Sequence, residues 1–297
     1  MKRIIASVGV VWLALIAIGV FAQEVKDANP DAKKPRRVST PVLIKTPGPL
    51  ERLQTSPRQH EWAEVESAGG RKVKTWVVYP KVDHPATVVI LIHENKGLTD
   101  WVRALADEVA EAGFVAVAPD LLSGTAPDGG NTTEYESEGD ATKAIYGLKQ
   151  PQVTSDLDAV FGYAKKLEAG NKVIAVAGFC WGGGQAFSYA AHNPNLAAAF
   201  VFYGSPKDGL EFKNIQAPVY GFYGGDDARI TSGVPEIEKR MKALDKKYQP
   251  VIYKGAKHAF MRQGDMTDDT KDANRKAREE AWARLTKLLG ELKPGTK

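Results

Sequence analysis

The sequence predicts an α/β fold: a doubly wound, mostly parallel sheet with helices on both faces. Three observations carry this prediction. Short runs of β-branched and aromatic residues recur along the chain, and amphipathic stretches of helical length separate them. Runs such as Thr87–Ile92 are apolar without alternation, which is typical of strands buried on both faces of a sheet. Residues 61–297 keep one composition regime, which predicts a single domain.

The domain is expected to open with a hairpin. Glu61–Ser67 and Lys72–Tyr79 alternate between apolar and polar residues around a glycine-containing turn. A helix over Asp100–Ala112 comes next, with Asp100 as its cap and Gly113 as its end. Residues 123–140 are rich in Gly, Thr and Asp, which predicts a long loop over the sheet end. The buried strands expected in this half are Thr87–Ile92 and Phe114–Ala118.

The second half of the domain alternates helices and strands. Pro151 favours the start of a helix over Gln152–Leu167, because proline is tolerated in a first helical turn. Apolar residues interleaved with charged ones predict the amphipathic helices Val234–Lys247 and Ala273–Leu289. The other helices expected are 141–149 and Gly183–His192, and the buried strands are Val173–Gly178, Ala197–Tyr203, Pro218–Tyr223 and Gln249–Tyr253.

The first 60 residues differ from this domain. Met1–Ala22 has a charged start, an apolar stretch and a small-residue cleavage site before Gln23, as in a secretory signal peptide. We therefore expect export to the periplasm or the medium, with no stable membrane span after processing; the alternative is an uncleaved segment that anchors the protein. Residues 23–57 hold six of the 17 prolines, which predicts a poorly ordered arm or tether over 23–60.

Charge and cysteine content exclude several classes of function. The net charge of +4 comes from the N-terminal 60 residues, because residues 61–297 have 30 basic and 32 acidic side chains. This balance argues against nucleic acid as a partner. One cysteine excludes an intramolecular disulfide, and the five histidines form no close ligand pair, so no metal site is expected.

The single cysteine lies between a predicted strand and a predicted helix. Gly178–Gly182 has the nucleophile-elbow pattern Gly-x-nucleophile-x-Gly, with Cys180 where serine is usual. Such a turn is strained, and glycine at its flanks lets neighbouring chain approach. The helix N-terminus favours a thiolate and an oxyanion. The alternative is a buried structural cysteine beside a glycine-rich turn. The residues that follow the other predicted strands distinguish a nucleophile from a structural cysteine.

In parallel sheets, reactive groups gather at the carboxyl ends of the strands. Here Glu94 comes after Thr87–Ile92, a pair of aspartates after Pro218–Tyr223, and His258 after Gln249–Tyr253. Nucleophile, acid and histidine in this order are the order of an α/β-hydrolase triad. Cys180 would attack an acyl carbon and His258 would shuttle the proton, with a carboxylate, Asp226 or Asp227, holding the other ring nitrogen.

An oxyanion hole is expected from two backbone amides. One is the N–H of Trp181, next to the nucleophile. The other comes from the loop after Thr87–Ile92, with Asn95 as the candidate. Neither contribution depends on the side chain.

Together these motifs resemble the dienelactone hydrolase family of α/β-hydrolases. The resemblance covers about residues 60–290, and its motifs are His93–Leu98, Gly178–Gly183, Tyr223–Ile230 and Gly255–Phe260. It implies the α/β-hydrolase fold, a Cys–Asp–His triad in which Asp227 is the acid, and hydrolysis of small lactones and esters without a cofactor.

The resemblance also implies roles for Glu94 and Arg262. Glu94 would pair with the resting thiol and help to form the thiolate when substrate arrives, and Arg262 would bind a substrate carboxylate. The family's lactone hydrolases supply a second arginine before the elbow, whereas residues 119–150 here contain lysines but no arginine. A lysine lacks the bidentate fork of arginine, so dienelactone itself is not predicted as the substrate.

The sequence thus predicts a hydrolase of small esters or lactones, with or without a carboxylate, that acts through a thioester on Cys180. One alternative is a broad short-chain carboxylesterase, in which Arg262 is not a substrate anchor. Another is a catalytically silent binding protein on the same scaffold. The protein is expected to be a monomer or a small homo-oligomer.

Overall fold

The computed structural model describes residues 47–293. The predicted signal peptide, residues 1–22, and residues 23–46 of the predicted arm lie outside this described part. Among the described helices, none combines the length and the apolar character that crossing a membrane requires.

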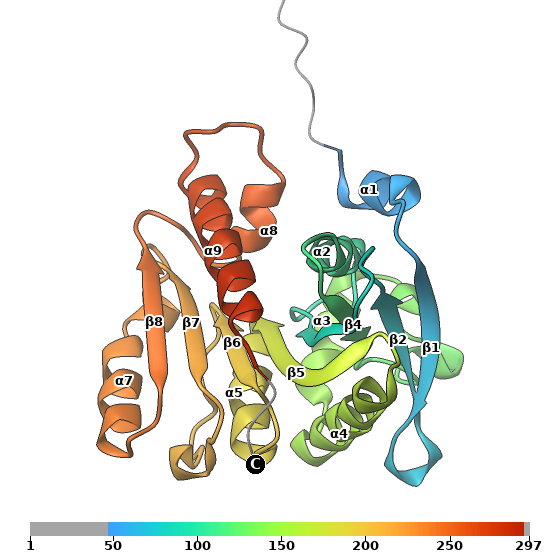
Figure 1. The fold of residues 1–297 in the computed structure, drawn as a ribbon, viewed down its shortest axis with the longest axis horizontal. Helices are drawn as coiled ribbons and strands as arrows, with labels where there is room; N and C mark the ends of the chain where they lie inside the picture. Colours follow the sequence, from blue (N-terminus) through green and yellow to red (C-terminus); the bar gives the residue numbers. More distant parts are fainter. Residues whose placement is uncertain (1–46, 294–297) are drawn as a thin grey trace, which may run out of the picture. The chain divides into compact units, whose positions relative to one another are not determined.

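An eight-stranded sheet forms the centre of the described part, in the order β1-β2-β4-β3-β5-β6-β7-β8 (Figure 1). The β1–β2 and β2–β4 pairs are antiparallel, and every other neighbouring pair is parallel. The predicted hairpin and the mostly parallel sheet are therefore present. The strands are β1 (His60–Glu66), β2 (Lys72–Val78), β3 (Ala86–Ile92), β4 (Val115–Pro119), β5 (Gly170–Phe179), β6 (Ala198–Phe202), β7 (Val219–Gly224) and β8 (Tyr248–Tyr253).

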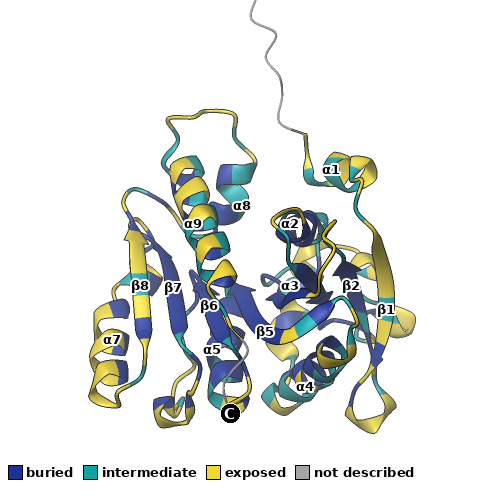
Figure 2. Ribbon diagram, viewed as in Figure 1, coloured by how far each residue is buried: buried dark blue, intermediate teal, exposed yellow. Residues whose placement is uncertain are grey.

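Helices cover both faces of the sheet and bury its side chains (Figure 2). Alternate residues of β3 point to opposite faces: Ile90 belongs to the core cluster that includes residues of α4, α5 and α7, whereas Leu91 belongs to the cluster that includes residues of α2, α8 and α9. This two-sided burial is why the strand has no polar alternation. The α-helices are α1 (Pro49–Thr55), α2 (Asp100–Glu111), α3 (Glu138–Gly147), α4 (Gln150–Lys166), α5 (Trp181–His192), α6 (Ala228–Thr231), α7 (Val234–Ala243), α8 (Phe260–Asp265) and α9 (Ala273–Gly290).

Several elements differ from the sequence-based expectations. Residues 47–60 of the arm predicted to be poorly ordered instead form helix α1 and lead into β1. Helix α7 ends at Ala243 rather than at Lys247, because Asp245 adopts a φ of 52° that a right-handed helix cannot accommodate. Asp100 is the first residue of α2, and Thr99 takes the N-cap position. The short helices α6 and α8 were not predicted.

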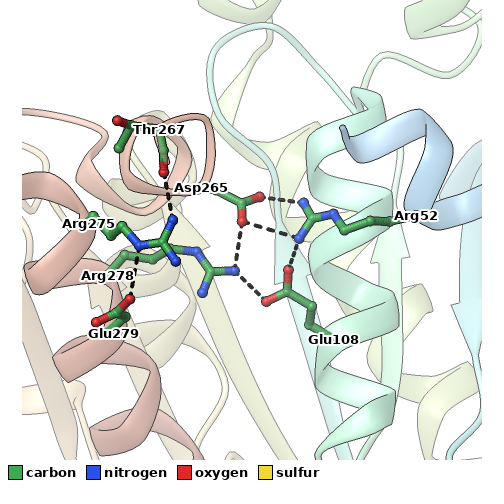
Figure 3. Close-up of polar contacts among 7 residues, drawn as sticks. All are labelled: Arg52, Glu108, Asp265, Thr267, Arg275, Arg278 and Glu279. Atoms are coloured by element: carbon green, nitrogen blue, oxygen red, sulfur yellow. Dashed lines mark hydrogen bonds and ion pairs between the residues drawn. The ribbon is translucent and has the colours of Figure 1, made fainter. Parts of the chain in front are cut away.

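A ring of four charged side chains joins helices from both ends of the chain (Figure 3). This charge ring consists of Arg52 on α1, Glu108 on α2, Asp265 on α8 and Arg278 on α9. Arg278 Nη2 lies 2.5 Å from Glu108 and 3.0 Å from Asp265, and Arg52 binds the same two carboxylates. The ring explains why α1 is ordered, because Arg52 ties it to two helices of the domain.

Candidate active site

Cys180 occupies a strained turn between β5 and α5. Its φ of 55° and ψ of −114° lie outside the conformations that non-glycine residues usually adopt. A Cβ added to Gly178 would lie 1.9 Å from the carbonyl oxygen of Gly182, and one added to Gly182 would lie 2.3 Å from that of Ile92. The glycines of the elbow pattern are therefore required by the close approach of neighbouring backbone.

His258 lies between Cys180 and Asp227. Its Nε2 is 3.1 Å from the sulfur of Cys180, and its Nδ1 is 2.5 Å from Oδ2 of Asp227. The β8–α8 loop carries His258, and Asp227 lies just after β7, so three strand ends bring the groups together. Asp226 is exposed instead, and its N–H donates to the carbonyl of Ala256.

Two backbone amides face the sulfur of Cys180. The N–H groups of Trp181 and Asn95 stabilise negative charge there and act to lower the pKa of the thiol. These are the two amides that the sequence predicts for an oxyanion hole. A carbonyl carbon attacked by the sulfur would bring its oxygen close to the same donors.

His93 holds the loop that carries one of these amides. It is completely buried, and its Nδ1–H donates to the carbonyl oxygen of Glu94 at 2.8 Å. Its Nε2 accepts from the N–H of Leu121 at 3.2 Å, and its ring stacks on Trp181 with centroids 5.7 Å apart. Burial lowers the pKa of His93, so the ring is neutral and keeps both hydrogen bonds.

The resting thiol of Cys180 is protonated at neutral pH. Burial raises its pKa to about 11, and the negative charge of Glu94 adds to this effect. The amides of Trp181 and Asn95 and the cation of Arg229 oppose it. Cys180 is therefore a neutral thiol beside a histidine, and Nε2 of His258 is the ring nitrogen next to its sulfur.

The sequence profile of the dienelactone hydrolase family matches residues 73–293. The chain belongs to the dienelactone hydrolase family. A relative from Escherichia coli named "Putative carboxymethylenebutenolidase" is 33% identical over 60% of this chain and 69% of its own length. A relative of the same name from Saccharolobus solfataricus is 28% identical over 74% of this chain and 94% of its own.

Solved structures support the same assignment. A "Putative Dienelactone Hydrolase" from Klebsiella pneumoniae has a TM-score of 0.67 and 27% identity, covering 79% of this chain and 99% of that one. An esterase from Pyrobaculum calidifontis shares the fold at a TM-score of 0.61 and 15% identity, over 81% of this chain and 88% of its own. This family member therefore has the α/β-hydrolase fold and is a carboxylic ester hydrolase.

In this dienelactone hydrolase family member, Arg262 is bound to Glu94. Nε of Arg262 donates to Oε2 of Glu94 at 2.7 Å, and the Glu94 side chain is 6% exposed. Both residues line a cavity of about 560 Å³, whereas Cys180 lines a different cavity of about 420 Å³. The structure thus brings Arg262 to Glu94, not to the cavity of the predicted nucleophile.

The Cys180 cavity contains residues that were not predicted from the sequence. Tyr203 lies just after β6 with a φ of 39°, and its ring meets that of His258 edge-on at 5.2 Å. Burial raises the pKa of Tyr203 well above its usual value, and the charges of Glu94 and Cys180 add to the rise. Its place at the carboxyl end of a parallel strand was the signal that could have found it. Lys207, Arg229 and Gln185 also line this cavity.

Within residues 47–293, no cluster of three or more His, Cys, Asp or Glu side chains is arranged to hold a metal ion. The buried carboxylates near the site are engaged otherwise, Asp227 with His258 and Glu94 with Arg262.

Proposed function

We propose that this enzyme hydrolyses small esters or lactones through a thioester on Cys180. The observation that carries the proposal is the continuous contact from Asp227 through His258 to the Cys180 sulfur, at 2.5 and 3.1 Å. The order of roles is nucleophile, general base and orienting carboxylate, as in other acyl-transfer triads.

In the first half of the reaction, Nε2 of His258 takes the thiol proton while the sulfur attacks the carbonyl carbon. The oxygen of the tetrahedral intermediate accepts hydrogen bonds from the N–H groups of Trp181 and Asn95. Asp227 stabilises the imidazolium by holding Nδ1. When the intermediate collapses, the C–O bond breaks and the leaving oxygen takes the proton from Nε2.

In the second half, water attacks the thioester carbon and gives its proton to His258. The carbon–sulfur bond breaks, the acid leaves, and the sulfur recovers its proton from the imidazolium. His258 is thus base and then acid in each half, which is consistent with its partial exposure next to the cavity.

Glu94 has a role in the resting enzyme under this proposal. Its charge adds to burial in raising the thiol pKa, so the nucleophile stays neutral until substrate binds. A neutral thiol resists oxidation better than an exposed thiolate. This supports a further proposal, that the protein is exported as its first 22 residues predict. N-terminal sequencing of the protein recovered from the periplasm should start at Gln23, and recovery of Met1 there would overturn cleavage.

A broad short-chain carboxylesterase is the second candidate. The observation that favours it is the ion pair of Arg262 with Glu94, in which a carboxylate of the protein already binds Nε of that arginine. The two candidates share the chemistry at Cys180 and differ only in which substrates bind.

The test of the proposed chemistry is Cys180→Ala assayed with 4-nitrophenyl acetate. We expect kcat to fall by about a thousandfold or more, as in triads that lose their nucleophile. Rapid quenching of the wild type should show an acetyl group on Cys180 by mass spectrometry. His84→Ala is the matched control, because His84 is exposed and does not line the Cys180 cavity. Equal hydrolysis by wild type and Cys180→Ala would reject the proposal.

A further inference from the structure

The loop that supplies the Asn95 amide is held at both of its ends by the segment between β4 and α3. This oxyanion loop runs from His93 to Leu98, between β3 and α2. At its start, Nε2 of His93 accepts from the N–H of Leu121 at 3.2 Å. At its end, the N–H of Leu98 donates to the hydroxyl oxygen of Thr132 at 3.0 Å. Asn95 lies between these two attachments, so its position depends on both.

A buried carboxylate fixes the hydroxyl of Thr132 in turn. Asp120 is 1% exposed, and its Oδ1 accepts from the Thr132 hydroxyl at 2.6 Å. Its Oδ2 accepts from the Thr132 backbone N–H at 2.9 Å. A hydroxyl has one proton to donate, and here that proton goes to Asp120. The lone pairs of the Thr132 oxygen are therefore left for the N–H of Leu98, so Asp120 sets the direction in which this hydroxyl bonds.

The oxyanion loop also packs directly against the Thr132 side chain. Gly97 has a φ of 80°, and a Cβ added to it would lie 2.2 Å from Oγ1 of Thr132 and 2.7 Å from its Cγ2. The backbone of the loop thus reaches Thr132 without an intervening side chain. Only two residues separate Leu98 from Asn95, so a displacement at Thr132 is passed on to the Asn95 amide over a short distance.

Loss of the Thr132 hydroxyl would leave the N–H of Leu98 without its acceptor. Leu98 is 1% exposed, and a buried N–H without a partner is unfavourable. The loop would therefore shift toward another acceptor and carry the Asn95 amide with it. An oxyanion hole works only when its donors lie within hydrogen-bonding distance of the developing oxyanion, so this shift bears on the reaction.

We propose that Thr132 is a positioning residue, oriented by Asp120, that holds the Asn95 amide where the oxyanion forms. The inference rests on the proposed function for the chemistry, and it adds two residues that lie outside the Cys180 cavity. His93 holds the start of the same loop, and Thr132 holds its end.

The first test compares Thr132→Val with Thr132→Ser in the hydrolysis of 4-nitrophenyl acetate. Complete loss of an oxyanion donor costs about a hundredfold to a thousandfold in kcat, so a displaced donor in Thr132→Val should cost about tenfold, with KM within about twofold. Thr132→Ser keeps the hydroxyl and should recover most of kcat. Thr133→Val is the matched control, because Thr133 is exposed and its hydroxyl bonds only Asn131 and Glu134 of the same turn.

A trifluoromethyl ketone, 1,1,1-trifluoropentan-2-one, tests the oxyanion more directly. The Cys180 sulfur adds to the carbonyl carbon, the thiol proton passes to Nε2 of His258, and the former carbonyl oxygen keeps the negative charge. The adduct has no leaving oxygen, so it stays tetrahedral. The inhibition constant should rise by about tenfold in Thr132→Val and stay near the wild-type value in Thr132→Ser and Thr133→Val.

A double variant tests the role given to Asp120. Asp120→Asn should lower kcat by itself, because an amide cannot accept from Thr132 with both of its ends. Combined with Thr132→Val it should lower kcat by no more than about twofold beyond the slower single variant, because residues of one hydrogen-bond network are not additive. Fully additive losses would overturn the role of Asp120. Thr132→Ala, which removes the hydroxyl with a smaller side chain, takes the place of Thr132→Val in each measurement if the valine variant does not fold.

Hydrogen exchange separates this inference from the chemistry. Without substrate, the amides of residues 93–98 should exchange faster in Thr132→Val than in wild type, Thr132→Ser or Thr133→Val. If Cys180→Ala hydrolyses the ester as fast as wild type, the thioester proposal fails, and faster exchange with a lower kcat in Thr132→Val still supports the positioning role. If hydrolysis requires Cys180 but Thr132→Val keeps the wild-type kcat and inhibition constant, the positioning role alone is overturned.

Discussion

Two ion-paired clusters meet on helix α8, and they differ in the groups that lie next to them. The charge ring includes Asp265 at the end of this helix, and the Glu94–Arg262 pair begins one turn earlier. The ring has two cations and two anions, each carboxylate bound to both arginines. The pair has one of each, and its carboxylate also acts on the Cys180 thiol.

On this six-residue helix, one cluster therefore affects the stability of the fold and the other affects the Cys180 thiol. The ring joins four helices and has no contact with the reacting atoms, so its energy acts on folding (Figure 3). The charge of Glu94 in the pair acts on the Cys180 thiol, so a change in that charge should alter the pKa of the thiol. Similar side chains on one short helix thus have different consequences, because of the groups that lie next to their carboxylates.

The largest expected effect comes from breaking the charge ring with Arg278→Met. This change removes one of two cations and leaves Glu108 and Asp265 sharing Arg52. Breaking a fully buried ion pair costs about 3–5 kcal/mol of folding free energy. The side chains of the ring are 7–20% exposed, so the free energy of unfolding should fall by somewhat less, about 2–3 kcal/mol. Urea unfolding at pH 7 measures it.

The stability that Arg278→Met loses should depend on pH and should be larger at neutral than at acidic pH. Burial already raises the pKa of Glu108 in the folded protein, and loss of Arg278 raises it further. A raised folded pKa gives stability that is present at low pH and lost as pH rises. The deficit of Arg278→Met should therefore be full at pH 7 and shrink as pH falls toward the usual range of a glutamate. A deficit that grows on acidification would contradict the role given to Glu108.

The second-largest expected effect is a change in the reactivity of the Cys180 thiol, caused by Glu94→Gln. The thiol pKa of about 11 leaves about one molecule in a thousand as thiolate at pH 8. Removing the Glu94 charge, and freeing the cation of Arg262, should lower this pKa by about one unit. Iodoacetamide should then alkylate Cys180 about tenfold faster at pH 8.

Arg262→Met is the matched variant from the same ion pair. It leaves the Glu94 charge without its cation, so the thiol pKa should rise and alkylation should slow. Arg278→Met should not change the alkylation profile, because the ring does not contact the thiol. The same rate in all four proteins would show that Glu94 does not control the nucleophile.

The sequence predicted the core of this site because backbone geometry and residue type agree there. Gly178 and Gly182 mark a turn that only glycine permits, and parallel strands bring their carboxyl ends to one edge. His258 and the adjacent pair Asp226 and Asp227 could therefore be placed near Cys180 from the order of strands, and the family resemblance selected Asp227. The fold was predictable for the same reason, because β3 and its neighbours are apolar on both faces.

Contacts between distant side chains could not be predicted in the same way. The role of Arg262 at a substrate carboxylate stays a prediction, but its ion pair with Glu94, 168 positions away in the sequence, was not predicted. Helix α1 was missed for a related reason: seven residues do not form a stable helix alone, and Arg52 finds its partners on α2 and α8. Such pairings depend on the packed structure and leave no local pattern.

The smallest expected effect is at Glu279, which pairs with Arg275 one turn away on α9 (Figure 3). Nε of Arg275 lies 3.1 Å from Oε1 of Glu279, but the Glu279 side chain is 59% exposed. Exposed pairs at this helical spacing contribute about 0.3–0.5 kcal/mol. Glu279→Gln should therefore change the free energy of unfolding by no more than that, and the change should vanish in 1 M salt. Arg275 and Glu279 flank Arg278 on the same helix, so a loss as large as that of Arg278→Met would mean that other charge changes on α9 are equally destabilising and that the ring contributes no more than an exposed pair.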